Sequence, residues 1–171
     1  MKDKLEIVSA IITNKEGNVL LLKRKDTLKL DPGKYDLCSG HMKTQEVPMQ
    51  SMLRELKEET GITQEQIKRM DNLGNIKTPH EMFLDTICHM YHIEIDLSIE
   101  QINKMIKEVE EPEMERAHYL KDVSELRIIQ KYTDFMRTIN TEEIEKVLIK
   151  LQETLNRRKE LKYGLCKSEE R

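Results

Sequence analysis

The chain has 171 residues, a length that suits one domain with a buried core. Its 29 basic and 32 acidic residues leave a net charge of −3, and this near balance argues against a large face for DNA or an anionic membrane. The apolar run behind the charged N-terminus is too short for a signal peptide or a membrane span. Three widely spaced cysteines lack the CxxC spacing of a zinc or redox site, so we expect a reduced, cytoplasmic protein.

The first part of the chain predicts three strands. Residues 5–13 (LEIVSAIIT) are rich in β-branched side chains, residues 14–18 carry the turn residues of a hairpin, and residues 19–22 predict the second strand. That strand ends in a basic triplet that contains Arg24. Residues 35–39 (YDLCS) predict a third, short strand that leads directly into a glycine turn.

A short helix with a dense acidic face follows the turn. Pro48 suits the first turn of a helix, and Gly61 suits a left-handed stop. The apolar residues between them recur at helical spacing and predict one stripe facing a core: Met49, Met52, Leu53 and Leu56. Glu55, Glu58 and Glu59 cluster on a separate face, where their like charges repel. Hard carboxylate ligands suit Mg²⁺ or Mn²⁺, so the cluster predicts a cation site.

Residues 40–62 (GHMKTQEVPMQSMLRELKEETGI) resemble the signature of the Nudix hydrolases. The signature reads Gly, five residues, Glu, seven residues, then Arg-Glu-apolar-x-Glu-Glu-x-Gly-apolar. This chain matches every position, with Gly40, Glu46, Arg54, Glu55, Leu56, Glu58, Glu59, Gly61 and Ile62. The resemblance implies an α/β/α sandwich with a mixed sheet. It also implies Mg²⁺- or Mn²⁺-dependent hydrolysis of a nucleoside diphosphate linked to another group, hence a small nucleotide-type substrate.

The resemblance also implies roles for residues within the signature. Glu55 and Glu59 are the strongest expected metal ligands, and the Gly40 carbonyl is expected to add one oxygen. Glu58 is expected to be a metal ligand or the general base. We expect Arg54 to form an ion pair that orients these carboxylates, with Glu46 supporting it. The bound metal would offset charge on the diphosphate and lower the pKa of a water nucleophile.

Two residues before the signature are candidates for binding substrate. In the family, a basic residue at the end of the second strand often lies near the substrate phosphates, which makes Arg24 a candidate. Tyr35 lies near a position where the family often has an aromatic residue, and it could stack on a nucleobase. The alternatives are a solvated strand end for Arg24 and a structural role for Tyr35.

The chain after the signature is less regular. Residues 63–70 predict a polar turn or a helical extension, and a longer extended region follows, in which residues 83–97 are the most convincing strand. His89 and His92 lie on opposite faces of that strand and therefore cannot form a paired ligand set. Residues 98–111 show the apolar spacing of a helix. The intervening loop, residues 74–82, and the earlier loop, residues 26–34, carry no pattern that identifies the nucleotide.

Residues 111–126 resemble the part of the family where a further acidic residue helps to bind metal or acts as the base. Glu113 and Glu115 are both candidates, and the choice between them and Glu58 stays open, as does the number of metal ions. Two more helices are predicted beyond this stretch, at residues 125–139 and 141–161.

We therefore expect a Nudix domain at residues 1–139 and a C-terminal helix and tail at residues 140–171. The last helix packs on the domain or pairs with a second subunit, so a homodimer is an open alternative.

Two other functions are compatible with part of the pattern. A catalytically silent nucleotide sensor with the Nudix fold would be free to lose carboxylates, yet this chain has lost none. Isopentenyl diphosphate isomerases share the Gly40-His41 start, but their cysteine directly precedes the glycine, where this chain has Ser39. Many family members read Pro-Gly-Gly where this chain has Cys38-Ser39-Gly40, and we expect Cys38 to take no part in the chemistry.

Overall fold

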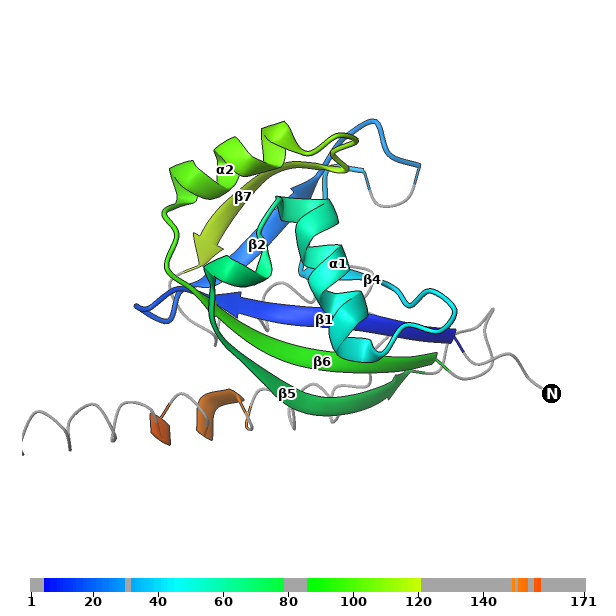
Figure 1. Ribbon diagram of the computed structural model, residues 1–171. Coiled ribbons are helices and arrows are strands. Elements are labelled where there is room, and N and C mark those ends of the chain that lie inside the picture. Colours follow the sequence, from blue (N-terminus) through cyan, green and yellow to red (C-terminus); the bar gives the residue numbers. More distant parts are fainter. Residues whose placement is uncertain are drawn as a thin grey trace, which may run out of the picture.

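The computed structural model describes residues 5–29, 32–78, 86–120, 149, 151–153 and 156–157. A seven-stranded sheet forms the centre, and two helices, α1 and α2, cover one of its faces (Figure 1). The elements in chain order are β1 (Leu5–Thr13), β2 (Val19–Arg24), β3 (Tyr35–Asp36), β4 (Cys38–His41), α1 (Pro48–Thr60), the 3₁₀ turn η1 (Gln64–Gln66), β5 (Ile67–Thr78), β6 (Thr86–Ile95), α2 (Ile99–Glu108) and β7 (Met114–Leu120).

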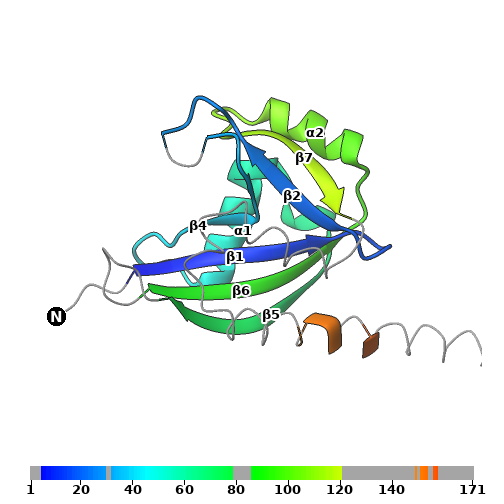
Figure 2. The ribbon, with the colours of Figure 1, turned by 180° about the vertical axis from the view of Figure 1, so that it is seen from behind.

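Strands β1 and β2 begin as a hairpin and then diverge. The Asn14 side chain closes the turn, because its carboxamide oxygen accepts hydrogen bonds from the backbone N–H groups of Glu16 and Asn18. Beyond the single pair Thr13–Val19, β1 pairs with β6 in parallel, whereas β2 pairs with β7 in antiparallel orientation. The wedge between them is filled by β3, which pairs with β2, and by β4, which pairs with β1 (Figures 1 and 2). The sheet is therefore mixed, as predicted.

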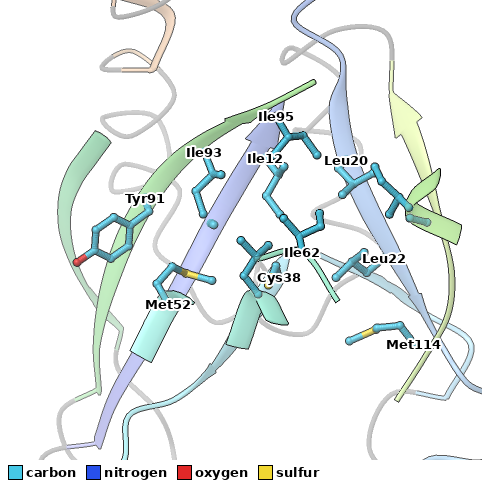
Figure 3. Close-up of a cluster of buried hydrophobic side chains, with 14 of the residues drawn as sticks. Ile12, Leu20, Leu22, Cys38, Met52, Ile62, Tyr91, Ile93, Ile95 and Met114 are labelled. Atoms are coloured by element: carbon cyan, nitrogen blue, oxygen red, sulfur yellow. The ribbon is translucent and has the colours of Figure 1, made fainter. Parts of the chain in front are cut away.

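The period of the strands divides the core between the two faces of the sheet. Val8, Ala10 and Ile12 of β1 join the cluster beneath α1 and α2, whereas Ile11 belongs to a second cluster on the opposite face. Figure 3 shows Met52 and Ile62 among the strand residues of the first cluster. The other labelled members of that cluster are Ile12, Leu20, Leu22, Cys38, Tyr91, Ile93, Ile95 and Met114. Both faces of the sheet therefore carry apolar side chains that must be shielded from water.

The helix of the signature forms as predicted, from Pro48 to a left-handed Gly61 with φ of 76°. The backbone N–H of Gly61 donates a hydrogen bond to the Lys57 carbonyl, which closes the last turn. Met52 and Leu56 are fully buried, but the prediction for Met49 was wrong, because this residue in the first turn is exposed. The predicted apolar stripe therefore starts one turn later than its spacing indicated.

The prediction of a polar turn or helical extension after α1 is confirmed only for residues 64–66, which form the 3₁₀ turn η1. Residues 67–70 were expected to form a turn or helix and residues 74–78 a loop, yet both lie in β5, which pairs with β6. The register of this pair shifts between Ile67 and Arg69 and again between Asn72 and Gly74. Such bulges change which face each residue points to, so the period-2 pattern that marks a strand is interrupted.

The elements predicted after residue 82 lie partly inside and partly outside the described residues. The predicted strand at residues 83–97 is present as β6, and the predicted helix at 98–111 as α2, while residues 83–85 lie outside the described part. Residues 121–148 are also outside it, so the helix at 125–139 and the domain division after residue 139 stay predictions. Residues 149, 151–153 and 156–157 are helical, and Leu151 is buried in the second cluster. Within the described ranges, no helix is long and apolar enough to cross a membrane.

Candidate active site

Strand β4 brings its glycine directly beneath α1. Gly40 pairs with Val8 of β1 in the wedge between β1 and β2. A Cβ atom built on Gly40 would collide with the carboxylate of Glu55. A side chain at this position would displace the Glu55 carboxylate, so the glycine allows the close approach of the first acidic residue of α1 to the strand.

Arg54 is the centre of an ion-pair network on the same side of α1. Its guanidinium holds Glu46 through two hydrogen bonds, Nε to Oε1 at 2.7 Å and Nη2 to Oε2 at 2.9 Å. Its Nη1 donates both to Glu55 Oε1 at 2.6 Å and to Glu58 Oε2 at 2.9 Å. A further bond from Nη2 reaches the carbonyl of His41 at 2.9 Å. Four groups from β4, the following loop and α1 are thereby joined by one side chain.

The loop between β4 and α1 is held by Glu46. The backbone N–H of Lys43 donates to Glu46 Oε2 at 2.9 Å, and the N–H of Glu46 donates to the Lys43 carbonyl at 3.1 Å. Hydrogen bonds from Arg54, and then the one from Lys43, lower the pKa of Glu46 to about 2. The turn requires a left-handed residue at Gln45, whose φ is 71°. Glu46 is thus a carboxylate whose charge is fully compensated by the protein.

Glu59 has the opposite environment. Its side chain points into the protein, with 7% of the residue exposed, and Oε2 accepts a hydrogen bond from the backbone N–H of Ser39 at 3.2 Å. Burial raises the pKa of Glu59 well above its usual value, although the Cys38 thiol, which donates to the carboxylate, acts in the other direction. Burial also raises the pKa of Cys38, which keeps the thiol protonated and able to donate. Among the described residues, no lysine or arginine forms an ion pair with Glu59.

Cys38 and Ser39 were not expected to take part in the site, and the contacts with Glu59 come from these two residues of β4. A further unexpected contact is made by Lys43, whose Nζ lies 3.4 Å from Glu58 Oε1. The sequence shows the positive charge of Lys43 near the signature, but the turn that carries it toward Glu58 depends on the Glu46 contacts. For Cys38, the only signal in the sequence was a thiol two residues before the signature glycine.

The three acidic residues of α1 offer only oxygen donors, which suits Mg²⁺ or Mn²⁺. Burial is also the main cause that raises the pKa of Glu55, so two of the three carboxylates are poorly solvated. As they stand, no three acidic, histidine or cysteine side chains in the described ranges converge on one point. Arg54 holds Glu55 and Glu58, whereas Glu59 is bonded to β4. The residue types fit a divalent cation, and Glu55, Glu58, Glu59 and the Gly40 carbonyl are the groups that could hold one.

The two predicted substrate-binding residues belong to β2 and β3, beside the signature strand β4. Tyr35 packs against the second core cluster, on the face of the sheet opposite α1. Its ring meets that of His118 edge to face at 4.5 Å, and its hydroxyl accepts a hydrogen bond from Arg116 at 3.5 Å. Arg24 lies at the end of β2, next to a bulge, where its N–H donates to the Lys34 carbonyl at 2.9 Å.

The predicted acidic residues near β7 contact β2. Glu115 accepts a hydrogen bond from Lys23 Nζ at 2.7 Å, which lowers the pKa of this carboxyl. The Glu113 carbonyl accepts a hydrogen bond from the N–H of Lys25 at 3.0 Å. No contact found in the described residues joins either side chain to the carboxylates of α1. The structure therefore does not bring Glu113 or Glu115 together with the signature.

Comparison with known proteins gives a consistent result. Residues 4–157 match the family model of the NUDIX domain. An 8-oxo-dGTP diphosphatase from Proteus vulgaris is 35% identical over 75 residues, which are 43% of this chain and 65% of that protein, so less than two thirds of it is spanned. Among solved structures, a MutT protein from Methanosarcina mazei Go1 has a TM-score of 0.59 at 21% identity, covering 90% of this chain and 96% of that one.

A second solved structure shows the same fold at lower identity. It is the NUDIX domain of Shewanella oneidensis NrtR complexed with ADP ribose, with a TM-score of 0.60 at 14% identity, covering 91% of this chain and 90% of that one. At these identities the likeness establishes the α/β/α fold with its mixed sheet, and the choice of substrate is a separate matter.

Proposed function

The chain belongs to the Nudix family of pyrophosphohydrolases, and we propose that it hydrolyses, with Mg²⁺ or Mn²⁺, the diphosphate linkage of a nucleoside diphosphate bound to another group. The observation that carries the metal requirement is the environment of Glu59. It is a buried carboxylate without an ion-pair partner in the described residues, beside a second poorly solvated carboxylate, Glu55. The charge of Glu59 is costly unless a cation neutralises it, because Arg54 already pairs with Glu55 but not with Glu59.

The proposed metal ligands are Glu55, Glu58 and Glu59, with the Gly40 carbonyl adding an oxygen. When bound, a divalent cation offsets charge on the diphosphate oxygens and lowers the pKa of a coordinated water. Arg54 has the role of holding Glu55 and Glu58 in place, supported by the bidentate contact with Glu46. This positions the carboxylates before substrate arrives.

Glu58 is our candidate for the general base. It lies on the exposed side of α1, where water has access, and Arg54 holds one of its oxygens. It would take the proton of the water that attacks phosphorus, while the bond between that phosphorus and the bridging oxygen breaks. Glu113 and Glu115 remain the alternatives, although the ion pair of Glu115 with Lys23 of β2 favours Glu115 less.

The proposed substrate is a small nucleotide-type diphosphate. Arg24 is proposed to contact phosphate and Tyr35 the base, at positions reached by an extended substrate. The 8-oxo-dGTP diphosphatase among the relatives makes purine nucleoside triphosphates the first compounds to test.

The test is a substrate panel with and without metal. The full-length protein is incubated with Mg²⁺ or Mn²⁺ and dNTPs, 8-oxo-dGTP, ADP-ribose, dinucleoside polyphosphates, nucleotide sugars and capped RNA. Phosphorus NMR then identifies the products. We expect turnover of at least one compound, its loss on addition of EDTA, and a strong decrease in Glu58→Gln but not in the control Glu108→Gln on α2. If no compound is turned over and Glu58→Gln binds nucleotides as wild type does, the protein is a sensor instead.

A further inference from the structure

Lys43 is held at the edge of the carboxylate cluster by its backbone. Its N–H and its carbonyl both bond Glu46, whose carboxylate is itself held by two hydrogen bonds from Arg54. The position of the Lys43 Cα atom is therefore tied to the ion-pair network, although the residue lies in a loop. Its side chain starts from a fixed point near Glu58.

Glu58 lies between two cations of different kinds. Arg54 Nη1 is 2.9 Å from Oε2, and Lys43 Nζ is 3.4 Å from Oε1. The Arg54 side chain is 18% exposed and makes several other hydrogen bonds, whereas that of Lys43 is 63% exposed, and Glu58 is its only ion-pair partner in the described residues. An exposed lysine–carboxylate pair contributes little stability, so Lys43 can leave Glu58 at low cost.

From this geometry we propose that Lys43 changes its partner during binding. Its ammonium contacts Glu58 in the metal-free protein and a phosphate of the substrate when metal is bound. Without metal, its ammonium partly neutralises Glu58. When a divalent cation occupies Glu58, the ammonium is displaced and binds an oxygen of the substrate phosphate held beside it. This inference rests on the proposed function, because it requires Glu58 to bind the metal.

The exchange predicts effects of opposite sign on two ligands. A positive charge a few ångströms from a cation site weakens cation binding and strengthens binding of a polyanion. Removing the charge is therefore expected to tighten metal binding and to weaken phosphate binding. A lysine that only supports the loop would, when replaced, weaken both.

The experiment compares Lys43→Gln and Lys43→Arg with the control Lys104→Gln, on the exposed side of α2. Isothermal titration calorimetry measures the Kd of Mn²⁺ alone, and then the Kd of inorganic pyrophosphate at saturating Mn²⁺. Where a substrate is known, KM and kcat are added. Thermal unfolding shows that each variant is folded, and Lys43→Met is a second neutral variant in case one is not.

For Lys43→Gln we expect the Kd of Mn²⁺ to fall about threefold and the Kd of pyrophosphate to rise about three- to tenfold, the size of one screened charge contact. KM should rise similarly while kcat changes less. Lys43→Arg and Lys104→Gln should behave as wild type for both ligands. Weaker or unchanged Mn²⁺ binding in Lys43→Gln, or unchanged pyrophosphate binding, overturns the exchange while leaving the proposed function intact. Failure of the wild type to bind Mn²⁺ overturns both.

Discussion

Two carboxylates of the same signature, Glu46 and Glu59, show how differently one residue type is treated in two regions of this protein. In the loop region, Arg54 and the Lys43 N–H satisfy Glu46 and lower its pKa to about 2. Against β4, Glu59 is buried with two neutral donors, and its pKa is raised. The first region is stable as it is, whereas the second gains from a cation. The comparison favours the β4 side of α1 for the proposed metal, with the loop as its support.

The largest effect is expected from neutralising the buried carboxylate. Glu59→Gln keeps the shape of the side chain but removes its charge, so we expect activity to fall on the order of a hundredfold or more. Because the buried charge is costly without metal, the metal-free variant is expected to unfold at a higher temperature than wild type near neutral pH. Thermal unfolding with EDTA and with Mn²⁺ measures both effects. Wild-type activity in this variant would remove Glu59 from the site, and Glu108→Gln is the control.

The next effect is expected from breaking the supporting network. Arg54→Met leaves Glu46, Glu55 and Glu58 without their shared partner, so we expect a loss of roughly 2 kcal/mol in the free energy of unfolding. Activity should fall about ten- to a hundredfold, because the carboxylates lose their orientation. Urea unfolding and steady-state kinetics give the two numbers. Arg69→Met, which removes an exposed pair with Asp71, is the matched control and is expected to change neither by much.

Glu59 and Glu46 are expected to change the stability of the protein with pH in opposite directions. The pKa of Glu59 in the folded protein lies above the usual 4.5, so its contribution to stability is present at low pH and lost as the pH rises through the folded-state pKa. The folded-state pKa of Glu46 is about 2, so its contribution is present above 4.5 and lost as the pH falls toward 2.

Urea unfolding in EDTA over this pH range tests both signs. Relative to wild type, Glu59→Gln should gain stability as the pH rises above 4.5. Relative to wild type, Glu46→Gln should instead lose stability as the pH rises from about 2 to 4.5, and its deficit should stay constant above 4.5. The same slope for both variants would contradict the difference between the two regions. Saturating Mn²⁺ should remove the penalty at Glu59 and leave the slope of Glu46 unchanged.

The smallest effect concerns the turn that presents Glu46. Gln45 is a non-glycine residue with φ of 71°, a left-handed conformation that costs about 1 kcal/mol. Gln45→Gly relieves this strain but raises the entropy of the unfolded chain, so we expect a net gain below about 1 kcal/mol in the free energy of unfolding. Gln45→Ala keeps the strain and is the control, with no gain expected. Equal stability of the two variants would show that the turn is not strained.

The signature helix was predictable from sequence because its signals are local. Proline at the start, glycine at the stop and apolar residues at helical spacing act within a few residues of one another. The hairpin of β1 and β2 was predictable for the same reason, from the side chain of Asn14. The exposure of Met49 was not predictable, because it depends on which turns of α1 lie over the sheet. The full extent of strand β5 was not predictable either, because two bulges interrupt its alternating pattern.

The site shows the same limit. The spacing of Glu55, Glu58 and Glu59 predicted that these residues form the acidic cluster. It did not predict that their environments differ. That Cys38 takes no part in the chemistry stays a prediction, but the hydrogen bond from its thiol to Glu59 was not predicted. This contact exists only because β4 enters the wedge between β1 and β2, a pairing that joins residues about thirty positions apart in the sequence.

By itself, then, the sequence determined the fold class and the family, because helix signals and the spacing of the signature are encoded in adjacent residues. Only the tertiary structure decided which carboxylate is buried, which is paired with Arg54 and which meets Lys43. Burial and ion pairing depend on contacts between distant parts of the chain, and these set the charge of each group far more than its residue type does. These long-range contacts therefore decide that Glu46 in the loop is paired with Arg54, whereas Glu59 against β4 has no ion-pair partner among the described residues.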